Sequence, residues 1–414
     1  VPAPPASAPS APVLPTVTGP VVHVGPNRPL KAIAAALARA KAGETVLVDP
    51  GTYTEAFKMR NQGKPGAPVT LRGLRGPNGE RPVLDATGVS LSGVGPTPRA
   101  IVQIEGAYCV VEGLELKNAR NGNNGAGIRF LNCTNAVVRD CKITHCDMGF
   151  QGGDLQTALV ERCEVAFNGT REYDGYSHNF YLTGNRITIR ECYIHDALFG
   201  QNFKTRGRYT ELWYNVICDS EQGELGLVDS DDSAQPNAHV VMVGNLVVSK
   251  ADRKGNPSKF IDFGGEGKAR NGALFLFHNT FVAGSPQIQF LRLNEPGNDL
   301  VASNNIFFGS HRIAELSGGK ASGNRNFASG SLPPGVANGL RGGQPGFVNP
   351  AARDFRLQPG APCANAGAPE STLVYLDAEG KSRTAVVDRQ IGAPLSTVPR
   401  PQKTAPDLGA FGSL

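Results

Sequence analysis

The sequence predicts an all-β solenoid, in which short strands stack turn upon turn along one axis. From residue 101 onward, two hydrophobic runs separated by a Cys, Asn or Gly recur eight times, as in AVVRDCKI and VMVGNLVV. The chain contains 51 glycines and 31 prolines, which suits a fold with many tight turns, and its 40% hydrophobic content argues against a disordered chain. A single repeat of this kind cannot bury its apolar side chains and must stack on its neighbours.

Aligning the repeats places eight residues in one column between the two hydrophobic runs. These residues are Gly113, Cys141, Cys163, Cys192, Asn215, Asn245, Asn279 and Asn305. Successive members are 22 to 34 residues apart, so the longer turns carry insertions. We expect the cysteines to point inward as buried thiols, and the asparagines to occupy turns, because Asn tolerates the left-handed conformation.

One helical segment is predicted ahead of the repeats, after a first strand at residues 21–24. In PLKAIAAALARAKAGE, the residues Leu30, Ile33 and Leu37 are spaced as on one face of a helix, and Gly43 follows as a stop signal. An amphipathic helix at this place suits a cap over the open end of the solenoid, which would otherwise expose apolar side chains and unpaired strand edges. TVLV, PVTLRG and AIVQIEG then continue as strands toward the regular body.

Changes in composition divide the chain into three predicted parts. Residues 1–20 form a Pro/Ala-rich linker, residues 21–345 the solenoid, and residues 346–414 an irregular tail that packs on it. The opening VPAPPASAPSAPVLPTVTGP looks like a mature N-terminus after signal removal, so we expect a secreted or periplasmic bacterial protein. We expect it to be a monomer.

Charge and hydropathy narrow the range of partners. The 41 basic and 36 acidic side chains give a net charge of +5, which permits a polyanionic ligand such as an acidic polysaccharide. No basic run typical of nucleic-acid binding occurs. No stretch of about 18 apolar residues occurs either, so no membrane span is expected.

The opening HVGPNRPLKAIAAALARAKAGETVLVDPGTYTE resembles the cap and first coils of right-handed parallel β-helix proteins of the pectate-lyase-like superfamily. The body repeats and the ending LDAEGKSR … DLGAFG are similar to bacterial secreted members of that group. The resemblance implies a right-handed parallel β-helix with an N-terminal capping helix. Because this fold hosts lyases, hydrolases, epimerases and non-catalytic adhesins, function has to be argued from particular residues.

Two segments that align at an offset of 23 residues, HNFYLTG and QNFKTRG, contain the candidate site. Phe180 aligns with Phe203, and side chains alternate along a strand. If both phenylalanines point inward, Tyr181 points outward and stands one turn from Lys204, at about 4.8 Å of backbone spacing. The outward set comprises Asn179, Tyr181, Asn202, Lys204 and Arg206.

This set suits β-elimination from a uronic-acid polysaccharide. The reaction removes a weakly acidic proton from C5 of the sugar, and the neighbouring carboxylate must be neutralised so that charge can develop. We assign Lys204 as the base, Arg206 as the group that neutralises the carboxylate, and Tyr181 as the acid or a second base. His178 is a candidate helper, although its place in the alternation points it inward. The candidate substrate-binding residues are Asn179, Asn202, Asp229, Asp262 and Glu266.

The segment NFKTRG also resembles the catalytic stretch of the alginate and dermatan β-helix lyases. The resemblance implies that Lys204 is the base. In that family an Arg on the next coil assists, but the next coil here reads GELGLVDSDD. The carboxylates that precede the lysine and hold calcium are not cleanly matched either, since FGQNF is neutral and only Asp196 is near.

The acidic residues after Lys204 allow two further interpretations. As hard oxygen ligands they suit Ca²⁺, and DSDDSAQPN is equally typical of a plain turn. Asp229 with Asp262 or Glu224 suits the carboxylate pair of a glycoside hydrolase. The metal candidates are Glu224, Asp229, Asp231 and Asp232.

The sequence thus predicts an enzyme, a polysaccharide lyase that cleaves a uronic-acid-containing polysaccharide by β-elimination. Three alternatives stay open. They are a glycoside hydrolase with paired carboxylates, a uronate C5-epimerase that returns the proton on the opposite face, and a non-catalytic carbohydrate-binding β-helix protein.

Overall fold

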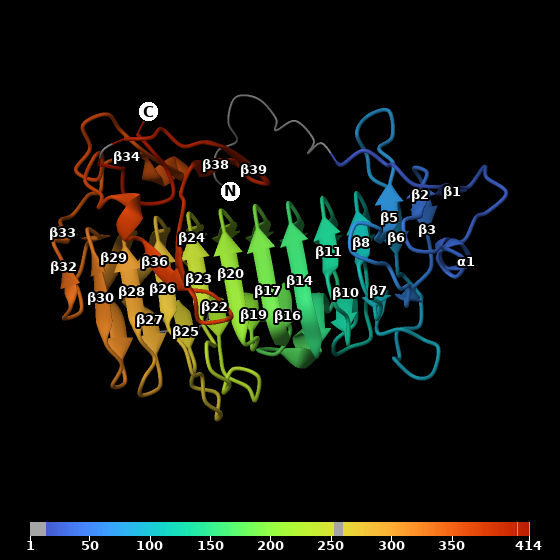
Figure 1. Cartoon of the computed structure of the whole chain (residues 1–414), viewed down its shortest axis with the longest axis horizontal. Coiled ribbons are helices and arrows are strands. Elements are labelled where there is room, and N and C mark those ends of the chain that lie inside the picture. Colours follow the sequence, from blue (N-terminus) through green and yellow to red (C-terminus); the bar gives the residue numbers. More distant parts are fainter. Residues whose placement is uncertain (1–13, 252–259, 404, 414) are drawn as a thin grey trace. The chain divides into compact units, whose positions relative to one another are not determined.

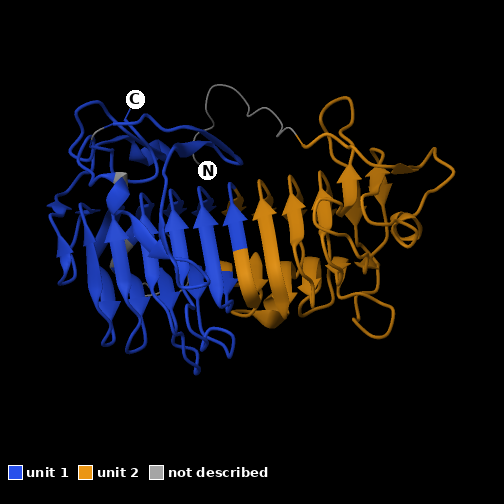
Figure 2. Ribbon diagram, viewed as in Figure 1, with its two compact units in different colours: residues 1–9, 188–191, 204–414 blue, residues 10–187, 192–203 orange. Residues whose placement is uncertain are grey.

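A computed structural model describes residues 14–251, 260–403 and 405–413. These residues form two compact units (Figure 2). Unit 1 comprises residues 188–191 and the described residues from 204 onward, and unit 2 comprises the described residues up to 187 together with 192–203. Residues 1–13 of the predicted N-terminal linker lie outside the described residues.

Both units are built from turns of a parallel β-solenoid, about 11 in total, and almost no residue is helical (Figure 1). Each turn adds a strand to a first sheet and one or two strands to a second. The predicted all-β solenoid is therefore confirmed. Two strands, β17 (Gly184–Arg190) and β19 (Gln201–Thr205), have residues in both units.

In unit 2, the first sheet has the order β1–β2–β5–β8–β11–β14. Its strands are β1 (Val21–Val24), β2 (Thr45–Val48), β5 (Val69–Gly73), β8 (Cys109–Glu112), β11 (Ala136–Arg139) and β14 (Leu155–Glu161). The second sheet contains β3 (Thr52–Tyr53), β4 (Phe57–Met59), β6 (Val83–Asp85), β7 (Ala100–Ile104), β9 (Glu115–Lys117), β10 (Ala126–Leu131), β12 (Lys142–Thr144), β13 (Met148–Gly153), β15 (Glu164–Ala166), β16 (Phe180–Leu182) and β18 (Tyr193–His195). A short 3₁₀ helix, η1 (Arg171–Tyr173), follows β15.

In unit 1, the first sheet continues the same pattern in the order β20–β23–β26–β28–β30–β32. Its strands are β20 (Tyr209–Trp213), β23 (Val240–Val243), β26 (Leu274–Phe277), β28 (Leu300–Ser303), β30 (Ala321–Asn324) and β32 (Val336–Ala337). The second sheet contains β21 (Val216–Cys218), β22 (Gly223–Leu227), β24 (Leu246–Val248), β25 (Ile261–Phe263), β27 (Thr280–Leu293), β29 (Ile306–Leu316), β31 (Phe327–Ala328) and β33 (Leu340–Arg341).

Successive turns pair in parallel register, so a side chain stacks on its equivalent in the next turn. Val138 pairs with Val111 on one side and with Val160 on the other. Inside unit 2, the ring centroids of Phe150 and Phe180 lie 4.5 Å apart, and both side chains are fully buried. The predicted inward orientation of Phe180 is confirmed.

A bend separates the two strands of each repeat, and its conformation differs from the prediction in one respect. The asparagines of the column are not the left-handed residues. That conformation belongs to the residue just before each column position, such as Tyr214 (φ 55°) and Gly244 (φ 67°). The predicted alignment of the repeats is also shifted by one residue at its first member. Glu115 pairs with Lys142, so Leu114, rather than Gly113, lies opposite Cys141.

The column asparagines instead form a buried ladder of hydrogen bonds in unit 1. The Oδ1 atom of Asn245 accepts the backbone N–H of Asn215 at 2.9 Å and its side-chain amide at 2.9 Å. The same two bonds recur between Asn245 and Asn279, and again from Asn279 to Asn305. Each asparagine thus satisfies backbone groups at a bend that cannot pair them within the strands.

The N-terminal capping helix is much shorter than predicted. The structure contains α1 (Ile33–Leu37), which has five residues, and it does not show a cap. Its first backbone N–H groups, those of Ile33 and Ala34, are accepted by the carboxylate of Glu55 at 2.8 and 3.0 Å. The apolar spacing identified a buried turn of helix but overestimated its length, because the backbone tightens after Leu37, where the N–H of Arg39 donates to the carbonyl of Ala36 at 3.1 Å.

The C-terminal segment forms three small antiparallel pairs rather than further turns of the solenoid. The pairs consist of β34 (Phe347–Asn349) with β35 (Asp354–Leu357), β36 (Val374–Leu376) with β37 (Ser382–Thr384), and β38 (Arg389–Ala393) with β39 (Ser396–Pro399). Two short 3₁₀ helices, η2 (Pro350–Ala352) and η3 (Glu370–Thr372), accompany them.

This segment packs against the first sheet of unit 1. The ring of Tyr375 meets those of Trp213 and Phe275 at centroid distances of 6.5 and 6.4 Å, and Arg353 donates to Asp219 at 2.6 Å. In the part of the chain that the structure describes, no helix is long and apolar enough to cross a membrane.

Candidate functional site

In unit 1, two predicted cations converge on one carboxylate. Lys204 Nζ donates to Glu266 Oε1 at 2.8 Å, and Arg206 donates to the other oxygen of the same carboxylate. Lys204 is 7% exposed, whereas the Glu266 side chain is 36% exposed. The expectation that Lys204 and Arg206 share one face is confirmed. Their shared partner, Glu266, was predicted as a substrate-binding residue and as one of the acidic residues suited to Ca²⁺.

Asp229 holds the segment that carries Glu266. Its two carboxylate oxygens accept the backbone N–H groups of Glu266 at 2.6 Å and Lys268 at 2.5 Å. Its backbone carbonyl accepts from Arg206 at 2.6 Å. The fully buried Asp229 therefore orders both the Glu266 segment and the Arg206 guanidinium, and the structure gives it a positioning role.

The segment that carries Glu266 has an unusual backbone. Gly264, Gly265 and Gly267 have φ values of 74°, 90° and 93°, which residues with a Cβ rarely adopt. This backbone turns back from the end of β25 and lays Glu266 over Lys204. The run GGEG in the sequence was the signal for such a turn.

A buried arginine that the sequence reasoning missed lies on the same loop. Arg270 is 2% exposed and donates to the carbonyl oxygens of Ala238, Gly207 and Val228 at 2.8–2.9 Å. Burial lowers its pKa to about 10. It ties the Glu266 loop to the segments next to three strands, at Gly207, Val228 and Ala238, and its place in KARNG gave no sequence signal for burial.

Asp262 begins a row of charged side chains along the second sheet of unit 1. In register, Asp262 pairs with Arg292 and Arg292 with Glu315 on successive turns. Arg292 Nε lies 3.1 Å from Asp262 Oδ1, and Arg312 donates to Glu315 at 3.0 Å. Arg292 was not predicted, because the long strand that carries it gives no motif.

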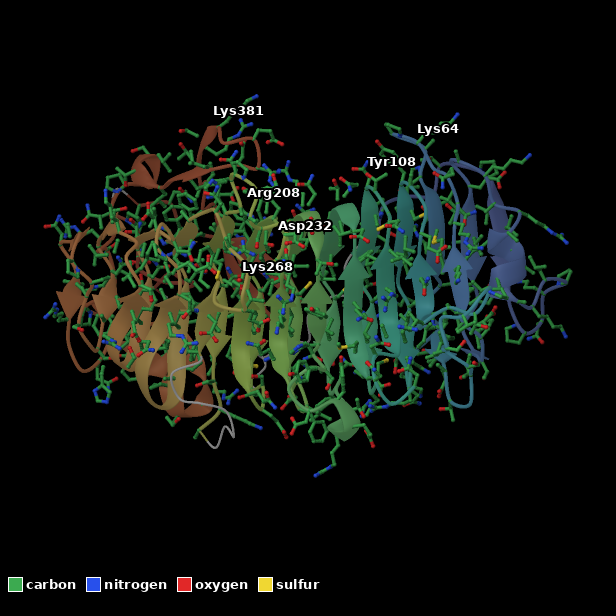
Figure 3. All side chains as sticks on the ribbon, turned by 90° about the horizontal axis from the view of Figure 1, so that it is seen from below. Lys64, Tyr108, Arg208, Asp232, Lys268 and Lys381 are labelled. Carbon is green, nitrogen blue, oxygen red and sulfur yellow. The ribbon has the colours of Figure 1, made fainter. Side chains whose placement is uncertain are left out.

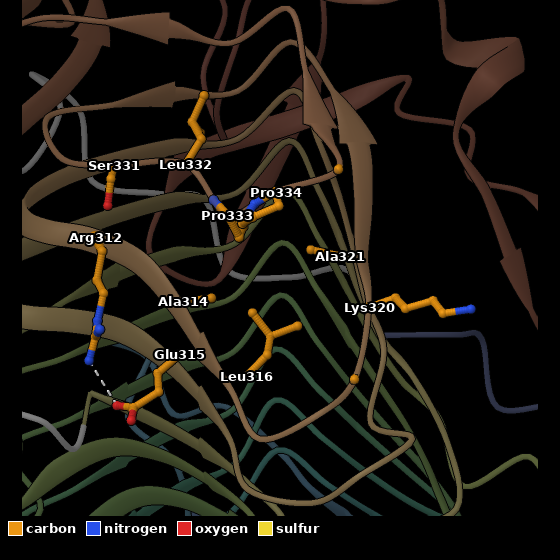
Figure 4. Close-up of a pocket in the computed structure, with 12 residues that line it drawn as sticks. Arg312, Ala314, Glu315, Leu316, Lys320, Ala321, Ser331, Leu332, Pro333 and Pro334 are labelled. Carbon is orange, nitrogen blue, oxygen red and sulfur yellow. Dashed lines mark hydrogen bonds and ion pairs between the residues drawn. The ribbon is translucent and has the colours of Figure 1, made fainter.

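An open pocket of about 740 Å³ lies at the end of this row (Figure 4). Arg312 and Glu315 form one wall, and Leu316, Leu332 and Pro333 contribute apolar surface. The pocket is two turns away from Asp262, so it extends the charged row rather than enclosing the Lys204 cluster.

The unit 2 candidates lie in different environments. Tyr181 is half-buried, and on the second sheet of unit 2 it pairs in register with Gln151 of the preceding turn. His178 is 2% exposed, as its inward parity predicted, and its Nδ1 accepts the backbone N–H of Gln201 at 3.0 Å. Its ring centroid lies 5.7 Å from that of Tyr181.

The predicted outward orientation of Asn179 and Asn202 is wrong. Both are fully buried, and Asn179 Nδ2 donates to Asn202 Oδ1 at 2.8 Å and to the carbonyl of His195 at 2.8 Å. Asn168 donates to Asn179 in the same way. Asn179 directly precedes β16 and Asn202 is the second residue of β19, and at these strand starts an inward amide satisfies neighbouring polar groups. At the start of a strand the strict alternation of its side chains does not hold.

Among the described residues, no three His, Cys, Asp or Glu side chains come together so that they could hold a metal ion. Of the calcium candidates, Asp231 is 88% exposed and pairs with Lys268 at 3.0 Å, while Glu224 is fully buried and accepts the backbone N–H of Ser220 at 3.3 Å. Asp232, which Figure 3 labels together with Lys268, is exposed. Because these carboxylates do not converge, we derive no step through calcium.

Comparisons with known proteins bear on the fold. Residues 86–246 match the family described as right handed beta helix region, and a comparison with curated proteins finds no match. The crystal structure of pectate lyase Pel9A is similar over 96% of this chain and 97% of that chain, with 17% identity and a TM-score of 0.54. The protein is a right-handed parallel β-helix.

Two further solved structures resemble the β-helix less closely. The alginate lyase from Paenibacillus sp. str. FPU-7 covers 70% of this chain and 94% of its own, with 16% identity and a TM-score of 0.49. A GH136 lacto-N-biosidase from Eubacterium ramulus covers 78% of this chain and 67% of its own, with 11% identity and a TM-score of 0.40. At such identities the likeness concerns the fold alone, and function has to be argued from the residues.

The predicted site residues thus fall into two groups. Lys204, Arg206, Asp229 and Glu266 come together in unit 1, with Asp262 on a separate row. Tyr181 belongs to unit 2 and Lys204 to unit 1, so the expected meeting of their side chains stays a prediction.

Proposed function

We propose that the β-helix is a polysaccharide lyase that cleaves a uronic-acid-containing polysaccharide by β-elimination. One observation carries the proposal: the amine of Lys204 and the guanidinium of Arg206 bind opposite oxygens of a single carboxylate, that of Glu266. A uronic acid presents the same chemical group to the enzyme. The pair is therefore suited to hold a sugar carboxylate beside the amine that would take the neighbouring proton.

In the proposed reaction, Arg206 binds the sugar carboxylate and stabilises the negative charge that develops on it. Lys204, in its neutral form, takes the proton from C5. The electrons of that C–H bond form the C4–C5 double bond, and the bond from C4 to the glycosidic oxygen breaks. The leaving oxygen receives a proton, a role that the sequence analysis assigned to Tyr181 and that stays a prediction.

Glu266 has to leave before a substrate carboxylate can bind in its place. A carboxylate at 2.8 Å favours the ammonium form of Lys204, which cannot accept a proton. Glu266 is carried by a glycine-rich loop and its side chain is over one third exposed, so its withdrawal uncovers Lys204 without disturbing a strand. Arg206, kept in place by the carbonyl of Asp229, then faces the incoming carboxylate.

The hydrolase alternative finds less support. Both oxygens of Asp229 are bound to backbone N–H groups, and Asp262 is paired with Arg292. Glu224 is fully buried. A glycoside hydrolase needs one free carboxylic acid and one carboxylate that face the scissile bond from opposite sides. The export of the protein, its bacterial origin and its monomeric state belong to the same proposal as the substrate.

The test is incubation with a panel of polyuronates while the absorbance of the unsaturated product is followed. We expect at least one polyuronate to give the signal, and Lys204→Ala to lower kcat at least about 1000-fold, since it removes the base. Lys320→Ala, which removes an exposed lysine of the same unit, serves as the matched control and should keep full activity. Release of reducing ends without an unsaturated product would refute the lyase and favour a hydrolase.

A further inference from the structure

A second outward row of polar side chains runs along the second sheet of unit 2. In register, Lys58 pairs with Gln103, Gln103 with Arg129, Arg129 with Gln151, and Gln151 with Tyr181. Buried apolar side chains flank the members of the row, except that Gly152 follows Gln151; around Arg129 they are Ile128 and Phe130. The five members therefore face outward one above another, at about 4.8 Å per turn.

Arg129 is the centre of this row and has no acidic partner among the described residues. Its guanidinium donates to the amide oxygen of Gln151, which is neutral. The side chain is half-buried, and this burial, together with the nearby positive charge of Arg99, lowers its pKa. A cation withdrawn from water with only a neutral partner is energetically costly, and an anion at this place would offset that cost.

Arg99 adds a second cation at the same place. Its guanidinium donates to the carbonyl of Ser92 at 3.1 Å, and no ion pair joins it to a carboxylate of the described residues. Glu105, the acidic side chain that Gln103 contacts, is already bound by Arg60 at 2.6 Å and by Gln103 at 2.5 Å. Two arginines thus lie together, and neither forms an ion pair with an acidic side chain of the described residues.

We infer that Arg129 and Arg99 bind a carboxylate of the acidic polysaccharide, in a subsite that Gln103 and Gln151 flank. A guanidinium offers two parallel N–H donors to a carboxylate, and the partly exposed amide of Gln151 suits a hydroxyl group of the sugar. Gln103 is buried, and its amide oxygen accepts the backbone N–H of Arg99 at 2.8 Å, so it supports Arg99 from the protein side. A polyuronate repeats its carboxylate at every sugar, so a cationic position in unit 2 has a matching group on the same kind of ligand. The inference rests on the proposed function, because it takes the ligand to be the same polymer.

The experiment measures binding without turnover. All proteins carry Lys204→Ala, and isothermal titration follows the binding of hexamers of galacturonate, mannuronate and guluronate, and of the methyl ester of each. We expect Arg129→Gln to weaken the tightest acidic hexamer about tenfold or more and to leave its methyl ester unchanged. Arg129→Lys, which keeps the charge but loses the fork geometry, should restore part of the affinity.

Arg39→Gln is the matched control, since it removes the charge of an exposed arginine of the same unit, and it should bind like its parent. Thermal unfolding of each variant separates a loss of binding from a loss of folding. If the parent binds an acidic hexamer and folded Arg129→Gln binds it equally well, the subsite is overturned while the proposed function stands. If no acidic hexamer binds the parent, the proposed function fails and this inference with it.

Discussion

At the residue scale, Glu266 decides the state of the candidate site. Its carboxylate lies between Lys204 and Arg206, where a sugar carboxylate would have to bind. Asp229 accepts the backbone N–H of Glu266 and thereby fixes this part of the loop. The Glu266 carboxylate is therefore held in its position beside the two cations. Glu266 therefore competes with the proposed substrate for the same two cations.

Glu266→Gln tests this competition. The amide keeps the shape of the side chain but loses its charge, so we expect KM for the active polyuronate to fall by about three- to tenfold. Steady-state kinetics give the split between KM and kcat. Glu315→Gln, at a glutamate that pairs with Arg312 on the charged row of the same unit, is the control and should leave KM within about twofold of wild type. An unchanged KM in Glu266→Gln would contradict the competition.

A second residue-scale feature is the buried His239. Its Nδ1 accepts the backbone N–H of Ala273 at 2.9 Å, so that nitrogen carries no proton in the folded state. Burial, followed by the positive charges of Arg208 and Arg270, lowers the pKa of His239 to about 4. The unfolded chain binds a proton at about pH 6.5. At that pH the folded state takes up no proton on His239, so protonation favours the unfolded chain. The stability that the neutral His239 contributes is therefore lost as pH falls from about 6.5 towards 4.

His239→Asn should reduce this pH dependence, because its amide oxygen can accept the same N–H without titrating. We expect the free energy of unfolding to fall on going from pH 7 to pH 4.5 by about 2 kcal/mol less in the variant than in wild type. Denaturant unfolding at both pH values measures the difference. His23→Asn, at an exposed histidine, should behave like wild type. Equal pH dependence in His239→Asn would rule out the buried neutral histidine.

At the scale of elements, the asparagine ladder joins the bends of successive turns in unit 1. Asn279 accepts two N–H groups from Asn245 and donates to the carbonyl of Met242 at 2.9 Å and to Asn305 at 3.0 Å. All these groups are buried. Loss of one amide therefore leaves several buried polar atoms without a partner.

Asn279→Ala should lower the free energy of unfolding by about 3 kcal/mol. Hydrogen exchange should also quicken at the backbone N–H of Asn245, which loses its acceptor. Asn271→Ala, at an exposed asparagine of the same unit, provides the comparison and should cost less than about 0.5 kcal/mol. Equal stability of the two variants would mean that the ladder contributes little.

The strands of the repeats could be predicted from the sequence, and the bends between them could be predicted only in part. The residues 21–24 form a strand as expected, and each aligned repeat forms two strands around its column. The column was correctly placed between the strands, but the left-handed residue precedes it. Which of two adjacent polar residues turns inward depends on hydrogen bonds to other turns, and one repeat contains no information about them.

At the scale of the whole molecule, all eight cysteines are free and buried. Burial raises the pKa of Cys109, Cys133 and Cys146 to about 12, and it raises that of Cys163 well above its usual value. The reactive thiolate is therefore scarce near neutral pH. The prediction that the column cysteines are buried thiols is confirmed.

Iodoacetamide should consequently leave the folded protein unmodified at pH 8 over the time in which it alkylates all eight thiols in denaturant. Intact mass spectrometry counts the added groups in each state, and a small thiol in the same tube verifies that the reagent is active. Rapid alkylation of even one thiol in the folded protein would contradict the burial of that cysteine.

The sequence by itself determined the solenoid, the place of its strands and the inward phenylalanines and cysteines. These features follow from a local pattern, the alternation along a strand, which is repeated at every turn. Only the tertiary structure revealed that Glu266 binds Lys204 and Arg206, that Asn179 and Asn202 turn inward, and that Arg129 has no acidic partner within the described part of the chain. Such contacts join residues on different turns and loops, and their geometry depends on insertions and bends that no single repeat encodes.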